Sequence, residues 1–477
     1  GRAPQVIDLL SKETEGNVFF LIETVRALAE EAGTLDNIGR MTLPPTVFAG
    51  GVQRVIERRL RRVPDEFQSL LQLAAVAGRS VDITLIRHIA EGVDIENWLN
   101  ACVNSAVFSV QDGQYRFAHD KIREGLLARI DEQEKATLNR KVAEAIEQVY
   151  PDDESFATVL VQHWAIAGEV EKEIHYSYCA AKQLRFRDIH GTHDYAIRVL
   201  DVIQSNEEDA RLPEIHWILG EISLNMSNHV RAKDHFDSGL RIATHQQSLT
   251  YRARCHDGLG HVAMRESETD IAMEHYQRAL TYAEETGDKH LIALIMNSIS
   301  GVHMEKGELD EAKSLAEESL KIARSIDDKI GITRDLNTLG IVAYRKGDLQ
   351  GAWDKFEETL EIRKELGMRH GVAAVMNNIG IIATALGKFE ESIQYHDESR
   401  RIKTEIGDRF GVGNSLQNIG MAYMSLGEYE TAKRYSEDAL VIAREIRHRA
   451  GEADMHNNLG LIIRRLDGDL QEAREHL

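Results

Sequence analysis

Three stretches from the second half of the chain align without gaps and decide its fold: LNTLGIVAYRKGDLQGAWDKFEETL (336–360), MNNIGIIATALGKFEESIQYHDESR (376–400) and LQNIGMAYMSLGEYETAKRYSEDAL (416–440). A small residue recurs in this half at intervals of 40 positions, at Gly220, Gly260, Ser300, Gly340, Gly380, Gly420 and Gly460. A fixed period of this length is the signature of a repeat architecture.

Two further positions repeat with the same period. Seven residues after the small residue comes a turn residue, which is Ser227, Ser267, Gly307, Gly347, Gly387 or Gly427. Five residues later comes a second small residue, at Ala232, Ala272, Ala312, Ala352, Ser392 and Ala432, often followed by an aromatic such as Phe236, Tyr276 or Phe356. Each unit is therefore predicted to be two helices joined by a tight turn, with small residues where the helices approach closely.

This pattern resembles the tetratricopeptide repeat (TPR) in a long form of its usual unit. The resemblance covers residues 207–477, with six full units and a seventh that is cut off. It implies a mainly α protein whose second half is a right-handed α-solenoid of TPR helix pairs. Just upstream, residues 151–206 hold two weaker helical patterns, which we expect to form irregular hairpins that lead into the solenoid.

Amide side chains recur on the first helix of successive units. They are Asn297, Asn337, Asn377, Gln417 and Asn457, with Asn378, Asn418 and Asn458 directly after three of them. In peptide-binding TPR proteins, which these copies resemble, asparagine at this place faces a concave groove and its amide can bind a peptide backbone. The resemblance implies a protein or peptide partner in that groove. The alternative is that the amides join adjacent helices as structural fasteners, and the sequence leaves both open.

The first 150 residues have a different pattern. Residues 1–43 include a predicted helix that stops at Gly33. Residues 44–150 read as several short helices, then VFSVQDGQYRF, whose Asp-Gly pair between alternating strands predicts a hairpin, and then a helix that begins near His119. This order predicts a winged-helix-like domain that ends near the acidic stretch around Pro151.

Three stretches here resemble the regulatory end of STAND nucleotide switches, which are related to AAA+ ATPases: EGNVFFLIE, LPPTVFAGGVQRVIERRLRRVPDEFQSLLQLAAVAG and YRFAHDKIREGLL. The resemblance implies that 1–43 is the remnant of a helical lid and 44–150 the winged helix. It also implies that His119 senses the ADP phosphate, with Asp120 as its local organiser. A helix amino terminus is a place that favours an anion. Val18 replaces the family's motif proline near adenine, and an acid in a first helical turn is favourable without any ligand.

The bulk properties exclude several classes of function. A formal net charge of -21 disfavours nucleic acid and anionic membranes as partners, and no apolar run is long enough to span a membrane. Cys102, Cys179 and Cys255 follow no disulfide or metal spacing, which indicates a reducing, cytoplasmic compartment. No phosphate loop and no metal motif occur, so the segment is expected to be no enzyme and to hold no cofactor or metal itself. We interpret the basic run as a solvated helix face that docks an upstream domain, in preference to a DNA contact: Arg54, Arg58, Arg59, Arg61 and Arg62.

These observations favour the regulatory arm of a bacterial STAND-type signalling ATPase. The chain begins with Gly1 and ends in a helical pattern, so we expect it to be a piece of a longer protein whose ATP- or ADP-binding core lies upstream, linked to a kinase or a nucleotide cyclase. The rival hypothesis is a TPR scaffold without nucleotide control, which Val18 favours.

Overall fold

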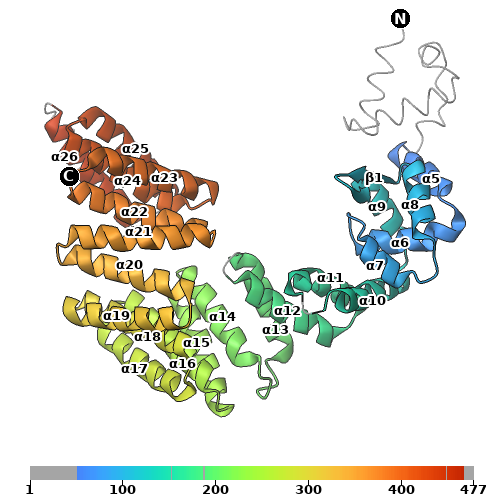
Figure 1. Ribbon diagram of the computed structural model, residues 1–477, viewed down its shortest axis with the longest axis horizontal. Coiled ribbons are helices and arrows are strands. Elements are labelled where there is room, and N and C mark those ends of the chain that lie inside the picture. Colours follow the sequence, from blue (N-terminus) through green and yellow to red (C-terminus); the bar gives the residue numbers. More distant parts are fainter. Residues whose placement is uncertain (1–50, 152, 186–187, 447, 467–477) are drawn as a thin grey trace, which may run out of the picture. The chain divides into compact units, whose positions relative to one another are not determined.

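The computed structural model describes residues 51–151, 153–185, 188–446 and 448–466 (Figure 1). The predicted helical lid over 1–43, with Val18, lies outside these residues. The chain forms two compact units, which are divided between Val202 and Ile203. The domain limits expected at 43, 150 and 206 stay a prediction. Among the described residues no helix is long and apolar enough to cross a membrane.

The first unit is a set of short helices with one β-hairpin. Its elements are α5 (Gly51–Arg62), η1 (Asp65–Phe67), α6 (Gln68–Ala77), α7 (Ile83–Ile89), α8 (Ile95–Asn104), β1 (Phe108–Gln111), β2 (Gln114–Phe117), α9 (Asp120–Leu127), α10 (Glu132–Val149), η2 (Glu154–Phe156), α11 (Ala157–Ala167), α12 (Val170–Leu184) and α13 (Ile189–Ile203), which reaches the second unit. The hairpin and the helix after it are thus confirmed. Asp112 and Gly113 both have positive φ, 51° and 75°, as a two-residue turn between twisted strands requires.

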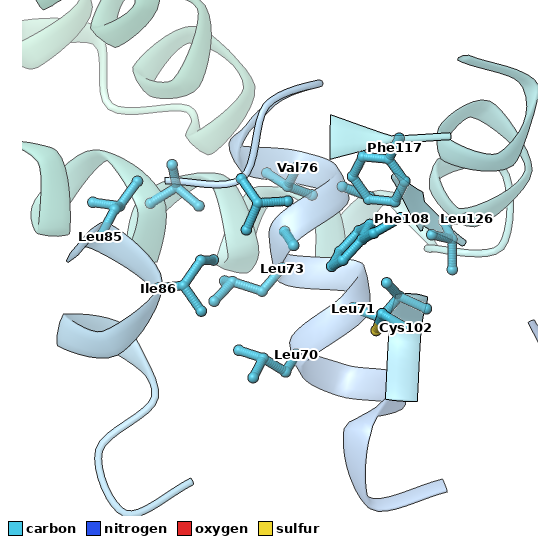
Figure 2. Close-up of a cluster of buried hydrophobic side chains, with 14 of the residues drawn as sticks. Leu70, Leu71, Leu73, Val76, Leu85, Ile86, Cys102, Phe108, Phe117 and Leu126 are labelled. Atoms are coloured by element: carbon cyan, nitrogen blue, oxygen red, sulfur yellow. The ribbon is translucent and has the colours of Figure 1, made fainter. Parts of the chain in front are cut away.

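The core of the first unit gathers around α6. Figure 2 shows Leu73 of α6 between Ile86 of α7 and Phe108 of the hairpin. The rings of Phe108 and Phe117 meet edge to face, with centroids 4.9 Å apart. The same cluster of buried residues continues past the hairpin to Trp164 of α11.

The second unit is a solenoid of consecutive helix pairs, which confirms the predicted fold class. The first helices of the pairs are α14 (Leu212–Asn225), α16 (Leu249–Arg265), α18 (Lys289–Glu305), α20 (Lys329–Arg345), α22 (Arg369–Ala385), α24 (Arg409–Leu426) and α26 (Arg449–Arg465). The second helices are α15 (His229–His245), α17 (Thr269–Thr286), α19 (Leu309–Ser325), α21 (Leu349–Glu365), α23 (Phe389–Glu405) and α25 (Tyr429–Glu445).

The turn residues explain why each helix ends where it does. All six residues predicted for the turn within a pair have positive φ, between 57° at Ser227 and 81° at Gly347 and Gly427. The turn between pairs repeats in the same way, through Gln247, Gly287, Asp327, Gly367 and Gly407. A left-handed residue ends a helix and reverses the chain, and glycine adopts this conformation without the steric cost of a Cβ. The second series was missed in the sequence, although three of its members are glycines in register.

At four of the small residues that recur every 40 positions, a ring from the second helix fills the space beside the glycine: Gly220, Gly260, Gly340 and Gly380. A Cβ on Gly220 would lie 2.5 Å from the ring of Phe236, and one on Gly340 would lie 2.7 Å from the ring of Phe356. Where the second helix has Ala316 instead, the first helix has Ser300, whose hydroxyl donates to the carbonyl of Ala312 at 2.7 Å. Side-chain size is therefore matched in these pairs, as close packing demands, whereas Gly420 faces the small Ser436.

Candidate peptide-binding face of the solenoid

The predicted amides of the first helices form a ladder that joins successive repeats. Asn378 Nδ2 donates to Asn337 Oδ1 at 3.2 Å, and Asn418 Nδ2 donates to Asn377 Oδ1 at 3.0 Å. Asn297 Nδ2 donates to the hydroxyl of Thr338 at 3.0 Å. Each bond joins positions 41 apart, so it connects a first helix to the first helix of the next repeat.

The ladder begins one repeat earlier than the amides do, because Ser298 Oγ donates to Asp257 Oδ1 at 3.0 Å. Asp257 and Thr338 were missed in the sequence because neither is an amide, but both stand in register with the ladder. At the other end, the described residues show no bond between Gln417 and Asn458, and Asn457 is exposed. The structure thus brings four of the eight predicted amides together in pairs.

The ladder uses only part of each amide. Asn337 and Asn377 accept through their carbonyl oxygens, and Asn378 and Asn418 donate through their nitrogens. All four side chains are half-buried, so part of each remains accessible to solvent. An amide has two donor hydrogens and an acceptor oxygen, so each one keeps hydrogen-bonding capacity after the ladder is made.

A histidine reinforces one rung. His396, which is 1% exposed, places Nδ1 3.1 Å from Asn377 Oδ1. Burial, with Lys403 as a second cause, lowers the pKa of His396 to about 4. The ring is therefore neutral at pH 7, and its Nδ1–H donates to the Asn377 oxygen. His396 also fills the place opposite Gly380 that an aromatic ring occupies in other repeats.

Apolar side chains lie on the same face as the ladder. Ile341, Ile381 and Met421 each follow a predicted amide by four residues, so they lie on the same side of α20, α22 and α24 as that amide. Met421 is 42% exposed, and Tyr344, one turn beyond Ile341, is 40% exposed. We call the ladder together with these side chains the ladder face. It combines amides that keep hydrogen-bonding capacity with an apolar strip.

Comparisons with known proteins agree with this geometry. A family model described as the MalT-like TPR region matches residues 176–369, and the tetratricopeptide repeat model matches 371–445 and 411–477. The chain is a TPR-type helical repeat protein. A comparison with curated protein sequences gave no match.

Solved structures share the TPR fold at low sequence identity. The STAND protein with a tetratricopeptide repeat sensor, PH0952 from Pyrococcus horikoshii, is 14% identical with a TM-score of 0.58, over 98% of this chain and 68% of that one. The Rap conjugation gene regulator of plasmid pLS20, in complex with the Phr* peptide, is 14% identical with a TM-score of 0.52, over 79% and 96%. The apo quorum sensor NprR from B. thuringiensis is 14% identical with a TM-score of 0.51, over 72% and 96%.

In the first unit of this TPR protein, His119 caps α9. The Lys121 backbone N–H donates to His119 Nδ1 at 3.2 Å, so the ring nitrogen Nδ1 carries no proton and Nε2 carries it in the neutral form. Asp120 is exposed and pairs with Arg79 Nε at 3.1 Å. Their role as a nucleotide sensor stays a prediction.

The basic run of α5 divides between two environments. Arg58, Arg61 and Arg62 are exposed, as expected for a solvated face. Arg59 is only 6% exposed and donates from Nη1 to the carbonyl of Ala106 at 2.6 Å. The solvated interpretation is wrong for Arg59, which ties α5 to the segment before the hairpin. Within the described part of the chain, no group of three metal-ligating side chains occurs.

Proposed function

We propose that the ladder face binds an extended peptide or protein segment, and that the chain is the receiving arm of a STAND-type signalling ATPase. The observation that carries the proposal is the half-used amide ladder beside an apolar strip. Free donors on Asn337 and Asn377 would pair with backbone carbonyls of the peptide, and free acceptors on Asn378 and Asn418 with its N–H groups. Ile341, Ile381 and Met421 would contact its apolar side chains.

Two observations support the wider assignment. The fold is similar to that of a STAND protein whose TPR region is described as a sensor, and the Rap regulator of similar fold was solved with a peptide. In the proposed scheme the peptide signal passes through the first unit to an upstream core that binds ADP or ATP. His119, with its proton on Nε2, would donate to a phosphate oxygen of that nucleotide. The output would be a kinase or a nucleotide cyclase.

The rival function is a scaffold in which the ladder only fastens repeats together. The bonds between Asn337 and Asn378 and between Asn377 and Asn418 favour this alternative, because they use the same amides. Fastening and peptide binding make different demands on stability, so one double variant separates them.

The test uses Asn337→Ala/Asn377→Ala, with Glu318→Ala/Glu361→Ala on exposed positions of second helices as the matched control. Peptides are selected on the wild-type chain from a random phage library, and their Kd is measured on all three proteins. We expect the ladder variant to bind at least about tenfold more weakly, since a lost hydrogen bond is worth about 1 kcal/mol and two are removed. A fall in melting temperature with unchanged peptide affinity would establish the fastener instead.

The relay to a nucleotide is tested in the full-length protein. His119→Ala is expected to speed the release of bound ADP or to raise basal output. If the variant and the wild type have the same nucleotide occupancy and release rate, the sensor role of His119 is excluded. The proposal that the ladder face binds a peptide would still stand.

A further inference from the structure

The second helices enclose a cleft that the ladder face does not include. Its volume is about 520 Å³, and residues of α19, of the carboxyl-terminal half of α20 and of α21 line it. Leu320, Leu339 and Val342 form an apolar floor, and their exposed fractions are 7%, 6% and 1%. These three side chains therefore close the bottom of the cleft and leave little of their own surface exposed.

Positive charge surrounds this floor. Lys313, Lys321, Arg324, Lys346 and Lys355 line the cleft, against the two acids Glu317 and Asp348. Such a cluster is a local exception in a chain with a formal net charge of -21.

Ion pairs with carboxylates account for three of the five cations. Arg324 Nη2 lies 2.6 Å from Glu358, Lys346 pairs with Asp310, and Lys313 Nζ lies 3.7 Å from Glu317. Lys321 and Lys355 make no ion pair with any described residue. Two ammonium groups at the rim therefore remain for an outside anion.

We call the space between two neighbouring second helices an interval. In the next interval of the solenoid, between α21 and α23, aromatic side chains stand at the positions of the cleft lysines. Forty residues after Lys313 and Lys355 stand Trp353 and Tyr395, on α21 and α23. Their rings meet at a centroid distance of 5.9 Å, and Lys388 covers Trp353 with Nζ 4.7 Å from the ring centroid. The preceding interval has Met273 and Leu315, which pack against a core cluster. Only the interval between α19 and α21 has two lysines here, among the intervals between described second helices.

The cleft and the ladder face lie on different sides of α20. Leu339 lies about 200° around the helix from Asn337, because successive residues turn by about 100°. An occupant of the cleft therefore leaves the amides of the ladder free.

We propose that this cleft is a second docking site, which takes an acidic amphipathic peptide segment of a partner protein. Carboxylates of the segment pair with Lys321 and Lys355, and its apolar side chains cover Leu339 and Val342. The apolar floor favours an amphipathic segment over a simple anion, because burying its aliphatic side chains adds a hydrophobic gain to the charge pairing. This proposal does not depend on the function of the ladder face.

The test measures fluorescence anisotropy of a labelled amphipathic peptide of Glu and Leu on the full chain. Two reference peptides replace every Glu by Lys, or every Leu by Ser. Lys313→Trp/Lys355→Tyr copies the filled interval and closes the cleft, and Lys321→Glu/Lys355→Glu reverses the free charges. Lys289→Glu/Lys364→Glu makes the same charge change at exposed positions outside the cleft.

We expect the Glu/Leu peptide to bind the wild type, and both cleft variants to bind it at least about tenfold more weakly, as for loss of a close charge pair. The outside control and the Asn337→Ala/Asn377→Ala variant should bind it as the wild type does. Three results overturn the proposal: no binding to the wild type, equal binding by the filled variant and the wild type, or equal binding of the Glu/Ser peptide. Since the filled variant could fold poorly, the charge-reversed variant gives the independent reading.

Discussion

Glycine at position 340 is required by the ring of Phe356, and substitution measures that requirement. In Gly340→Ala, the new Cβ would lie 2.7, 2.8 and 3.0 Å from three atoms of a ring that is 2% exposed. Carbon atoms pack best about 3.5–4.0 Å apart, so ring and helix must separate by almost 1 Å. Overpacking of this kind costs about 1–3 kcal/mol, against a gain of about 1 kcal/mol from the better helix propensity of alanine. We expect a net destabilisation of up to about 2 kcal/mol.

Gly301 provides the matched control. It lies in α18, where a Cβ would meet no atom within 4 Å. Gly301→Ala therefore keeps only the propensity gain and should stabilise the protein by about 0.5–1 kcal/mol. Opposite signs for the same chemical change would show that packing, and not the loss of backbone freedom, decides the effect at Gly340.

The assay is urea unfolding followed by circular dichroism, with hydrogen exchange of peptides from α20 and α21 to localise the change. Local measurement is needed because repeats of a solenoid can open separately. Gly340→Ser/Phe356→Ala, which copies the pair Ser300 and Ala316, should cost less than the sum of its two single changes. Additive costs, or equal effects of Gly340→Ala and Gly301→Ala, would refute the size-matching argument.

Three further predictions concern buried charge and the turns. Burial lowers the pKa of His163, His256 and His396 from 6.5 to about 4. Between these two pH values the unfolded chain binds more protons than the folded chain, so each histidine should lower the free energy of unfolding by about 2 kcal/mol at pH 5. Urea unfolding at pH 7.5 and at pH 5 measures this loss. Burial raises the pKa of Asp335 to about 6. The cost of burying the ionised carboxylate is therefore absent below the unfolded pKa near 4 and complete above pH 6. Asp335→Asn should stabilise the fold by about 1–3 kcal/mol at pH 8 and have little effect at pH 4. Ser267 has a φ of 63°, so Ser267→Gly should raise the urea midpoint, by about 0.5–1 kcal/mol of stability; a lower midpoint would contradict the strain.

The repeat architecture was predictable because residues close together in the sequence determine helix length and turn position. Gly347 and Gly387 mark left-handed turns in any solenoid of this period, whatever lies around them. The hairpin turn at Asp112 and Gly113 is equally local. Such features depend on neighbours in sequence, so one chain suffices to place them.

The contacts between repeats were not predictable in the same way. The amides were recognised as a series, but the partner of Asn337 is Asn378 and not Asn377, so the contact joins positions 41 apart and not 40. Arg59 looked like one more exposed cation of a basic run, yet the fold buries it against the carbonyl of Ala106. Both depend on packing between elements, which periodicity does not determine.

Departures from the period carry the specific chemistry of the solenoid. A solenoid repeat contacts mainly its neighbours, so one interval can change its side chains while the others keep the stack stable. Between α21 and α23 the rings of Trp353 and Tyr395 meet edge to face, whereas the same two positions one repeat earlier are Lys313 and Lys355, which line the cleft. Lys313 and Lys355 do not make the ring contact that Trp353 and Tyr395 make one repeat later, although the helices around them follow the same period. In this chain, therefore, residues that break the 40-residue regularity between second helices are to be tested for binding in addition to the periodic amides of the ladder face.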